Sequence, residues 1–163
     1  MDGQMFVRVD ERLLHGQILL KWLSYLSCAN VVVLDEALSA DPVSKSIMRS
    51  TLPRDKEFFA YDVQGGTFLL ESRVLQGNSL VIMRDVSTLD YLIQHCTAVR
   101  EVNIAKLPPG YGKRKICEHV YVSPSDIRLL QGIQDKGVVL YSQLVPDSER
   151  TLLPLFKAET EEG

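Results

Sequence analysis

The chain has few of the residues that staple small proteins or bind metals. Its 163 residues include three cysteines, three histidines and one tryptophan. Cys28, Cys96 and Cys117 are odd in number and far apart, and no two of them form a CxxC pair. The sequence therefore suggests neither a disulfide framework nor a zinc site. A domain of this length can bury a core without such staples.

An excess of positive charge and long apolar runs are also lacking. Eighteen Lys and Arg residues stand against 21 Asp and Glu, which gives a net charge of −3. Nucleic-acid-binding domains usually carry a basic excess, so no nucleic-acid partner is expected. No apolar run is long enough to cross a bilayer. The first four residues, Met1 to Gln4, lack the basic and apolar regions of a signal peptide, so we expect a cytoplasmic protein.

Strand-like and helix-like segments alternate along the chain. Apolar, β-branched runs predict strands at 5–9, 30–34, 57–61, 79–83, 101–105, 119–122 and 138–144. Apolar periodicity and capping residues predict helices at 16–26, 41–50, 66–75 and 87–95, the last capped by Ser87, and one that opens at Ser123. This alternation predicts one α/β domain over residues 1–158. We expect three α/β/α layers around an open, mostly parallel central sheet, followed by a frayed acidic tail at 159–163.

Ligands of such sheets bind at the carboxyl ends of the strands, which directs attention to the loop after the first strand. That loop contains a histidine immediately before a helix start, and its imidazole is a good nucleophile near neutral pH. Arg8 and Arg12 offer planar, permanently charged donors for phosphate oxygens. The amides of Gly16 and Gln17 open the helix and provide an anion site, and Gly16 also keeps side-chain bulk away.

Each feature has an ordinary structural explanation when taken alone. A histidine at a helix start is more often a cap, and the two arginines can end a strand or pair with Asp10 or Glu11. Together on the first strand–helix turn, they favour phosphoryl transfer, which depends mainly on positioning and charge. Asp10 is then a candidate to orient His15 by accepting its other ring proton.

The loop resembles the signature of the IIB component of the mannose/fructose/sorbose family of the bacterial sugar phosphotransferase system. That signature is Arg-x-Asp-x-Arg-Leu-x-His-Gly-Gln. Its fixed positions are all filled here, by Arg8, Asp10, Arg12, Leu13, His15, Gly16 and Gln17. Further resemblance extends over most of the chain, at Trp22, Asp35-Glu36, Asp41-Pro42 and Val145-Pro146-Asp147.

The resemblance implies a phosphoryl carrier, a protein-N(π)-phosphohistidine–sugar phosphotransferase. His15 would accept phosphate from a phospho-IIA protein and pass it to sugar held by a IIC/IID membrane complex, with which the chain would associate peripherally. The family also implies a homodimer and no metal or organic cofactor. It uses the Nδ1 ring atom, whereas the sequence shows neither the reacting nitrogen nor the sugar. One departure stands at 103–106, where Asn-Ile-Ala-Lys replaces the usual Asn-Val-Gly-Gly.

Three alternatives remain open. A receiver-like domain would be phosphorylated on aspartate beside Mg²⁺, with carboxylates or polar groups from Asp10, Glu11, Asp62, Ser87 and Lys106 at the strand ends. Against it, Arg8 and Arg12 crowd positive charge where the metal would bind.

A cysteine thiolate is a second possible acceptor, although the cysteines are more simply read as small buried residues. The third alternative is a binding module without turnover, in which the arginines hold an anionic metabolite and Asp35 and Glu36 line its pocket. The basic segment 113–115 either faces an acidic partner or is a solvated turn.

Overall fold

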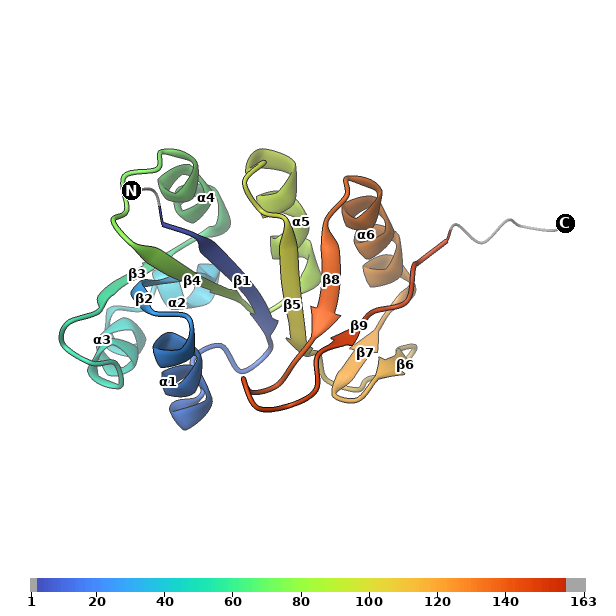
Figure 1. Cartoon of the computed structure of the whole chain (residues 1–163), viewed down its shortest axis with the longest axis horizontal. Coiled ribbons are helices and arrows are strands. Elements are labelled where there is room, and N and C mark those ends of the chain that lie inside the picture. The colour runs from blue at the N-terminus through green and yellow to red at the C-terminus, as the bar shows by residue number, and fades with distance from the viewer. Residues whose placement is uncertain (1–2, 158–163) are drawn as a thin grey trace, which may run out of the picture.

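Seven strands form the central sheet in the computed structural model, which describes residues 3–157 (Figure 1). The strand order is β3-β2-β4-β1-β5-β8-β9, and every neighbouring pair is parallel except β8 and β9. The sheet strands are β1 (Met5–Asp10), β2 (Cys28–Leu34), β3 (Glu57–Tyr61), β4 (Asn78–Met83), β5 (Glu101–Lys106), β8 (Val139–Ser142) and β9 (Thr151–Leu152). A separate antiparallel ribbon contains β6 (Arg114–Cys117) and β7 (Val120–Val122).

Helices cover both faces of the sheet, which confirms the three-layer α/β prediction (Figure 1). They are α1 (Gly16–Tyr25), α2 (Glu36–Ser39), α3 (Pro42–Ser50), α4 (Val63–Glu71), α5 (Val86–His95) and α6 (Pro124–Asp135). Side chains of α1 and α2 pack on one face, and those of α4, α5 and α6 pack on the other. Within the described residues, no helix has the length and apolar character that a membrane span requires.

The two faces explain why the central strands are so apolar. Successive residues of a strand point to opposite faces. Val31 and Val33 therefore pack in the core beneath α1, whereas Val32 and Leu34 pack in the core beneath α4 and α5. A parallel strand covered on both faces has no polar side, and this is what the apolar run of β2 reflects.

Several predicted boundaries are wrong, for local reasons. The cap of α5 is Asp85, which accepts from the Thr88 amide at 2.9 Å, so that helix begins before Ser87. Asp62 caps α4 in the same way, and the helix ends at Glu71 instead of 75. An Asp carboxylate satisfies free helix amides as well as a serine does, so both carboxylates set earlier starts. The predicted helix start at Ser123 is confirmed, and Ser123 forms a capping box with Asp126.

Hydrophobic periodicity in the sequence did not reveal the shortest strands of the fold. The segment predicted at 119–122 belongs to the β6–β7 ribbon, outside the central sheet. The last predicted strand ends at Ser142, and its chain returns as β9, antiparallel to β8. Elements of two to four residues are too short to show a repeating pattern. The predicted tail at 159–163 lies outside the described residues.

Candidate functional site

The loop predicted as the site joins β1 to α1 at the carboxyl edge of the sheet. Strand β1 lies between β4 and β5, so its end is near the middle of that edge (Figure 1). After Asp10 the chain turns tightly, with the Leu13 amide donating to the Asp10 carbonyl at 2.9 Å and with Leu13 in the left-handed region at φ 56°. Leu13 is buried and anchors the loop against the core beneath α1.

His15 occupies the N-cap position of α1, and its ring is exposed. The ring makes no capping hydrogen bond, so it does not serve as the side-chain cap of α1. Gly16 follows with φ +45°, and a Cβ placed there would meet nothing within 4 Å. Glycine therefore suits the left-handed backbone conformation of this position. That it also leaves room for an approaching phosphoryl group stays a prediction. The amides of Gly16 and Gln17 begin the helix, where N–H groups lack intrahelical acceptors.

Arg12 is held against Asp10 by a two-pronged contact. Its Nε and Nη2 donate to the two carboxylate oxygens at 3.0 and 2.9 Å, and its own amide donates to Oδ1 at 3.0 Å. The hydrogen bond to Asp10 raises the pKa of Arg12. A guanidinium has five N–H donors, and no described residue accepts from those that remain. Arg12 is therefore fixed in direction while part of its charge stays free for an anion.

Asp10 is the centre of a buried charge cluster. It is 1% exposed and accepts hydrogen bonds from both Arg12 and Arg8. Burial alone would raise the pKa of Asp10, but hydrogen bonds from Arg12 and the charges of both arginines outweigh burial and lower it. The predicted hydrogen bond from the His15 ring to the Asp10 carboxylate is absent from the described part of the chain, because donors of Arg8 and Arg12 occupy the carboxylate.

Arg8 does not lie where the sequence placed it. Its side chain is buried and faces protein groups: Nη1 donates to the Gln143 carbonyl at 3.1 Å, and Nη2 donates to the Leu144 carbonyl at 3.0 Å. Its guanidinium carbon also lies 5.5 Å from the centre of the Trp22 ring. Burial lowers the pKa of Arg8, although the Asp10 charge opposes that effect. The structure thus brings Arg12, but not Arg8, to the exposed side of the loop.

Two further basic residues lie at this edge; Arg84 escaped the sequence analysis, and Lys106 entered it only under the receiver-like alternative. Arg84, just after β4, donates to the Glu11 carbonyl at 3.0 Å and pairs with Asp35 at 3.2 Å. Lys106 ends β5 and lies 4.0 Å from the Glu11 carboxylate. The signal was available, because the ends of neighbouring parallel strands meet at one edge. Asp35 also caps α2, so it is occupied within the fold and does not line an open pocket.

The receiver-like alternative fails on topology. Strand β3 is at the edge of the sheet, and Asp62, which follows it, is three strands away from Asp10. At about 4.8 Å per strand this is roughly 14 Å, too far for the two carboxylates to share one cation. Within the described residues, His, Cys, Asp and Glu side chains nowhere gather in threes that could hold a metal ion.

The cysteines are poor acceptors as well. Burial raises the pKa of the Cys28 thiol to about 12. Cys28 begins β2, so it lies at the amino ends of the parallel strands, whereas His15 follows the carboxyl end of β1. Cys96 is buried, and burial raises the pKa of the partly buried Cys117. A thiol nucleophile needs the reverse, an exposed and electropositive setting.

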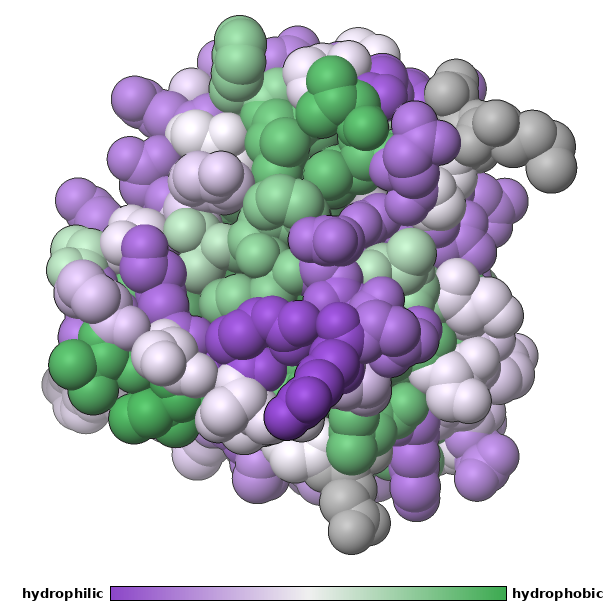
Figure 2. Space-filling view, turned by 90° about the vertical axis from the view of Figure 1, so that its left-hand side faces the viewer, coloured by the Kyte–Doolittle hydropathy of each residue, from purple (hydrophilic) through white to green (hydrophobic). Residues whose placement is uncertain are grey.

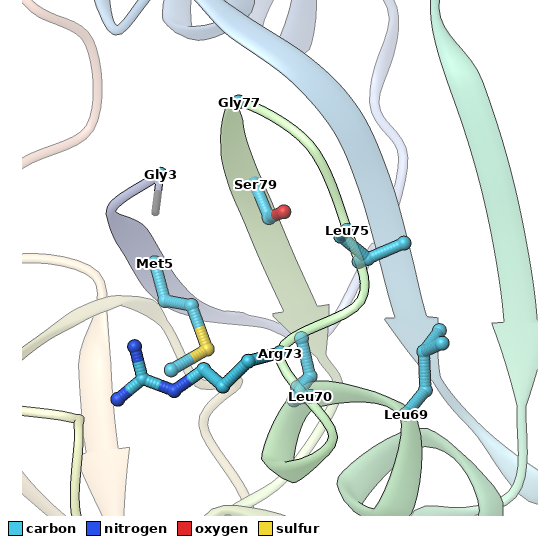
Figure 3. A pocket seen from close by; sticks show the side chains of 8 residues that line it. All are labelled: Gly3, Met5, Leu69, Leu70, Arg73, Leu75, Gly77 and Ser79. Carbon is cyan, nitrogen blue, oxygen red and sulfur yellow. The ribbon is translucent and has the colours of Figure 1, made fainter. Parts of the chain in front are cut away.

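A small hollow lies at the amino ends of the parallel strands, where β1 and β4 begin (Figure 3). Mainly apolar side chains line it, including Met5, Leu70 and Leu75, and the Arg73 side chain reaches across toward Met5. Its volume of about 30 Å³ admits little more than a water molecule. It is therefore too small for a sugar and is remote from the His15 loop.

Comparisons with known proteins identify the family and the fold of this chain. A family model described as "PTS system sorbose subfamily IIB component" matches residues 4–162. N-acetylgalactosamine-specific phosphotransferase enzyme IIB component 1 of Escherichia coli is 25% identical over 155 residues, covering 92% of this chain and 96% of that protein. The fructose-specific EIIB component of Bacillus subtilis is 24% identical over 162 residues, covering 98% and 99%. The crystal structure of the E. coli IIB component 1 covers 93% of this chain and 100% of that one, with 24% identity and a TM-score of 0.86.

Proposed function

The chain belongs to the sorbose subfamily of phosphotransferase-system IIB components, and from that membership we propose that it carries a phosphoryl group to sugar on the imidazole of His15. The observation that carries this proposal is the exposed His15 ring at the N-cap of α1, which makes no capping hydrogen bond and stands three residues after an arginine fixed by Asp10. A ring that is not engaged in capping its own helix is free to react. The neighbouring donors suit the charge of a phosphoryl group.

The first transfer is an exchange of one N–P bond for another. A lone pair on the neutral His15 ring attacks phosphorus of a phosphohistidine on the IIA partner. The new N–P bond forms as the donor N–P bond breaks, and the donor imidazole leaves neutral because its other ring nitrogen carries a proton. In the second transfer a sugar hydroxyl attacks, its proton passes to solvent, and His15 returns as a neutral ring. We place the phosphoryl group on Nδ1, as the family resemblance implies.

The protein contributes direction and charge to both steps. Little covalent assistance is needed at phosphorus, so electrostatic stabilisation dominates. The free N–H groups of Arg12 can meet equatorial phosphoryl oxygens, while Asp10 fixes the guanidinium plane. The amides of Gly16 and Gln17 add donors at the positive end of α1. In this proposal Arg8 holds the Asp10 carboxylate from the buried side of the loop and does not touch the phosphoryl group.

The partners follow from this chemistry. The phosphoryl donor is a IIA protein or domain, and the acceptor is a sugar held by IIC/IID membrane subunits, at which the chain would associate peripherally in the cytoplasm. The relatives named above act on N-acetylgalactosamine and fructose. We leave the sugar open between amino sugars and simple hexoses.

A homodimer is the second part of the proposal. Strand β3 has only β2 beside it among the described strands, so one row of its backbone donors and acceptors is unpaired. Exposed apolar side chains surround this edge, namely Val43 and Ile47 on α3, Tyr61 on β3 and Phe68 on α4. Figure 2 shows the apolar colour gathered on this side of the molecule. A second copy would cover these groups by pairing edge to edge.

Sedimentation tests the dimer. Ile47→Glu places a charge on the proposed interface, and it should convert a dimer to a monomer. Leu155→Glu is the matched control, because Leu155 is equally exposed but belongs to the C-terminal segment at the far side of the molecule (Figure 1). A wild type that sediments as a monomer at all concentrations would remove this part of the proposal.

The carrier function is tested by incubation with a phosphorylated IIA protein. Wild type and the three single Cys→Ser variants should gain one phosphoryl group by intact mass, and His15→Ala should gain none. The bond should survive alkali and be lost in acid, as a phosphoramidate is; an acyl phosphate would be lost in alkali. Phosphorylation of His15→Ala to the wild-type level would end the proposal.

A further inference from the structure

Arg8 is anchored on two consecutive carbonyl groups of the loop that joins β8 to β9. Each carbonyl also receives a second donor. The Gln143 oxygen accepts from Arg8 at 3.1 Å and from the Asn103 side chain at 2.9 Å. The Leu144 oxygen accepts from Arg8 at 3.0 Å and from the Trp22 indole at 3.0 Å. A carbonyl oxygen has two lone pairs, so the acceptor capacity of both groups is filled.

The loop that presents these carbonyls is itself braced. The Asn103 side chain accepts from the Gln143 amide at 3.0 Å, so it fixes that residue from both sides. The Gln143 side chain donates to the carbonyls of Pro146 and Ser148 at 3.2 and 3.0 Å. Ser148 closes the turn by hydrogen bonds to the backbone of Val145. The loop is thus a preformed acceptor for a guanidinium group.

From Arg8 the contacts continue to the site. Its Nη2, which binds the Leu144 carbonyl, also donates to Asp10 Oδ2 at 3.3 Å. The same carboxylate oxygen accepts from Arg12 at 2.9 Å. A continuous series of hydrogen bonds therefore connects Trp22 to Arg12 through Leu144, Arg8 and Asp10. If Arg8 shifted, Asp10 would lose one of its two arginine partners and could turn away from Arg12.

We propose that Trp22 and Asn103 are positioning residues for phosphoryl transfer, which hold Arg8 on the β8–β9 loop and thereby set the direction of Arg12. This inference rests on the proposed roles of His15 and Arg12. Neither Trp22 nor Asn103 touches the phosphoryl group. Their effect reaches it through the Arg8–Asp10–Arg12 cluster.

Core packing alone accounts poorly for these contacts. The Trp22 side chain is buried in the core beneath α1, yet its one polar atom is directed to a carbonyl that Arg8 also uses. The ring is additionally close enough to the Arg8 guanidinium for a cation–π contact. A buried ion cluster is weak as a source of stability, because an apolar cluster of similar volume often does as well. Fixing a charged group in one direction is a use that apolar packing cannot supply.

The test distinguishes an effect on the orientation of Arg12 from a general loss of folding stability. Trp22→Phe keeps the aromatic face but removes the N–H that binds Leu144, and Asn103→Ala removes both contacts to Gln143. Tyr25→Phe is the matched control on the same helix, because Tyr25 is exposed and touches Trp22 only by its ring edge. Ile133→Val, in the core beneath α6, lowers stability without touching these contacts. Potassium phosphoramidate serves as the phosphoryl donor, so that docking of a partner protein does not enter.

We expect Trp22→Phe and Asn103→Ala each to slow phosphorylation of His15 by about tenfold at saturating donor, with the half-saturating donor concentration unchanged. The Arg12 Nε–H resonance in ¹H–¹⁵N spectra should shift in both variants, because its bond to Asp10 changes. Both controls should keep the wild-type rate and resonance. Fluorescence of Trp22, the only tryptophan of the chain, should respond to phosphorylation in wild type and not in His15→Ala.

The outcomes are distinguishable. If wild type takes no phosphoryl group from either phosphoramidate or a phospho-IIA protein, the proposed function fails and this inference falls with it. If wild type is phosphorylated and both variants match its rate, Trp22 and Asn103 are not positioning residues. The same conclusion follows if Ile133→Val slows the reaction as much as they do. Should Trp22→Phe fail to fold, the Asn103→Ala rate and resonance decide the question.

Discussion

Removing the charge of Asp10 is the perturbation whose effect the structure defines most closely. Asp10→Asn keeps the size of the side chain but replaces one acceptor oxygen by a donor NH₂ group that faces a guanidinium. Arg8 is 4% exposed and would lose its carboxylate partner, because its other hydrogen-bond acceptors among the described residues are neutral carbonyls. Breaking a buried ion pair from one side costs about 3–5 kcal/mol. With a urea m value of about 2 kcal/mol/M, the unfolding midpoint should fall by about 2 M.

The effect should depend on pH with a definite sign. The pKa of Asp10 is lowered in the folded protein, so its charge stabilises the fold above the unfolded-state pKa of about 3.9. That stabilisation is lost as pH falls through the lower, folded-state pKa. The difference between wild type and Asp10→Asn should therefore be constant from pH 7 to pH 5 and shrink below about pH 4.

Urea unfolding followed by circular dichroism measures both quantities. Asp55→Asn is the matched control, because Asp55 is 77% exposed and lies 3.9 Å from Lys56. An exposed pair of this kind contributes about 0–1 kcal/mol, so the control midpoint should move by less than about 0.5 M. A shift for Asp10→Asn as small as that of the control, or one unchanged down to pH 3, would refute the buried-cluster reasoning.

Arg12, His15 and Cys28 each give one further prediction. Arg12→Ala should slow phosphoryl transfer in single-turnover assays by about 10²-fold or more. Its far-UV circular dichroism spectrum should stay native, because Arg8 still partners Asp10. Loss of the native spectrum would mean that Arg12 mainly supports the fold. His15→Gln should take up no phosphate yet bind a IIA partner in calorimetry with wild-type affinity, since the exposed ring does not cap α1 and its loss should leave the fold intact. A lost complex would make His15 a docking residue. Cys28, whose pKa burial raises to about 12, should resist iodoacetamide at pH 8 until urea unfolds the chain, and rapid native alkylation at Cys28 by peptide mapping would contradict its burial.

Much of the fold was readable from the sequence, because two-sided burial leaves a strong mark. Strand β2 is apolar at six of its seven positions and β4 at the last four of its six, and such runs are typical of a parallel sheet covered on both faces. Helix starts were readable where a capping residue precedes proline, as at Ser123. They were misplaced where an aspartate one or two residues earlier offered an equally good cap, as Asp85 does.

The sequence identified the loop that forms the candidate site, but it did not show that the two arginines have different roles there. The sequence treated Arg8 and Arg12 as equivalent, whereas the structure separates them. Arg8 stands between Val7 and Val9 within a strand covered on both faces, so its side chain is buried whichever way it points. Besides Asp10, its partners are two carbonyls 135 and 136 positions away, and backbone acceptors at such separation leave no trace in residue types. Arg12 follows the strand and is free to face solvent.

The central claim is that one particular imidazole accepts the phosphoryl group, and ¹⁵N NMR of histidine-labelled protein tests it most directly. The chain has three histidines, and the other two, His95 and His119, lie outside the loop. After reaction with a phosphorylated IIA protein, the ring nitrogens of His15 alone should shift and show coupling to phosphorus. A coupled signal from His95 or His119, or full phosphorylation with all three rings unchanged, would contradict the account.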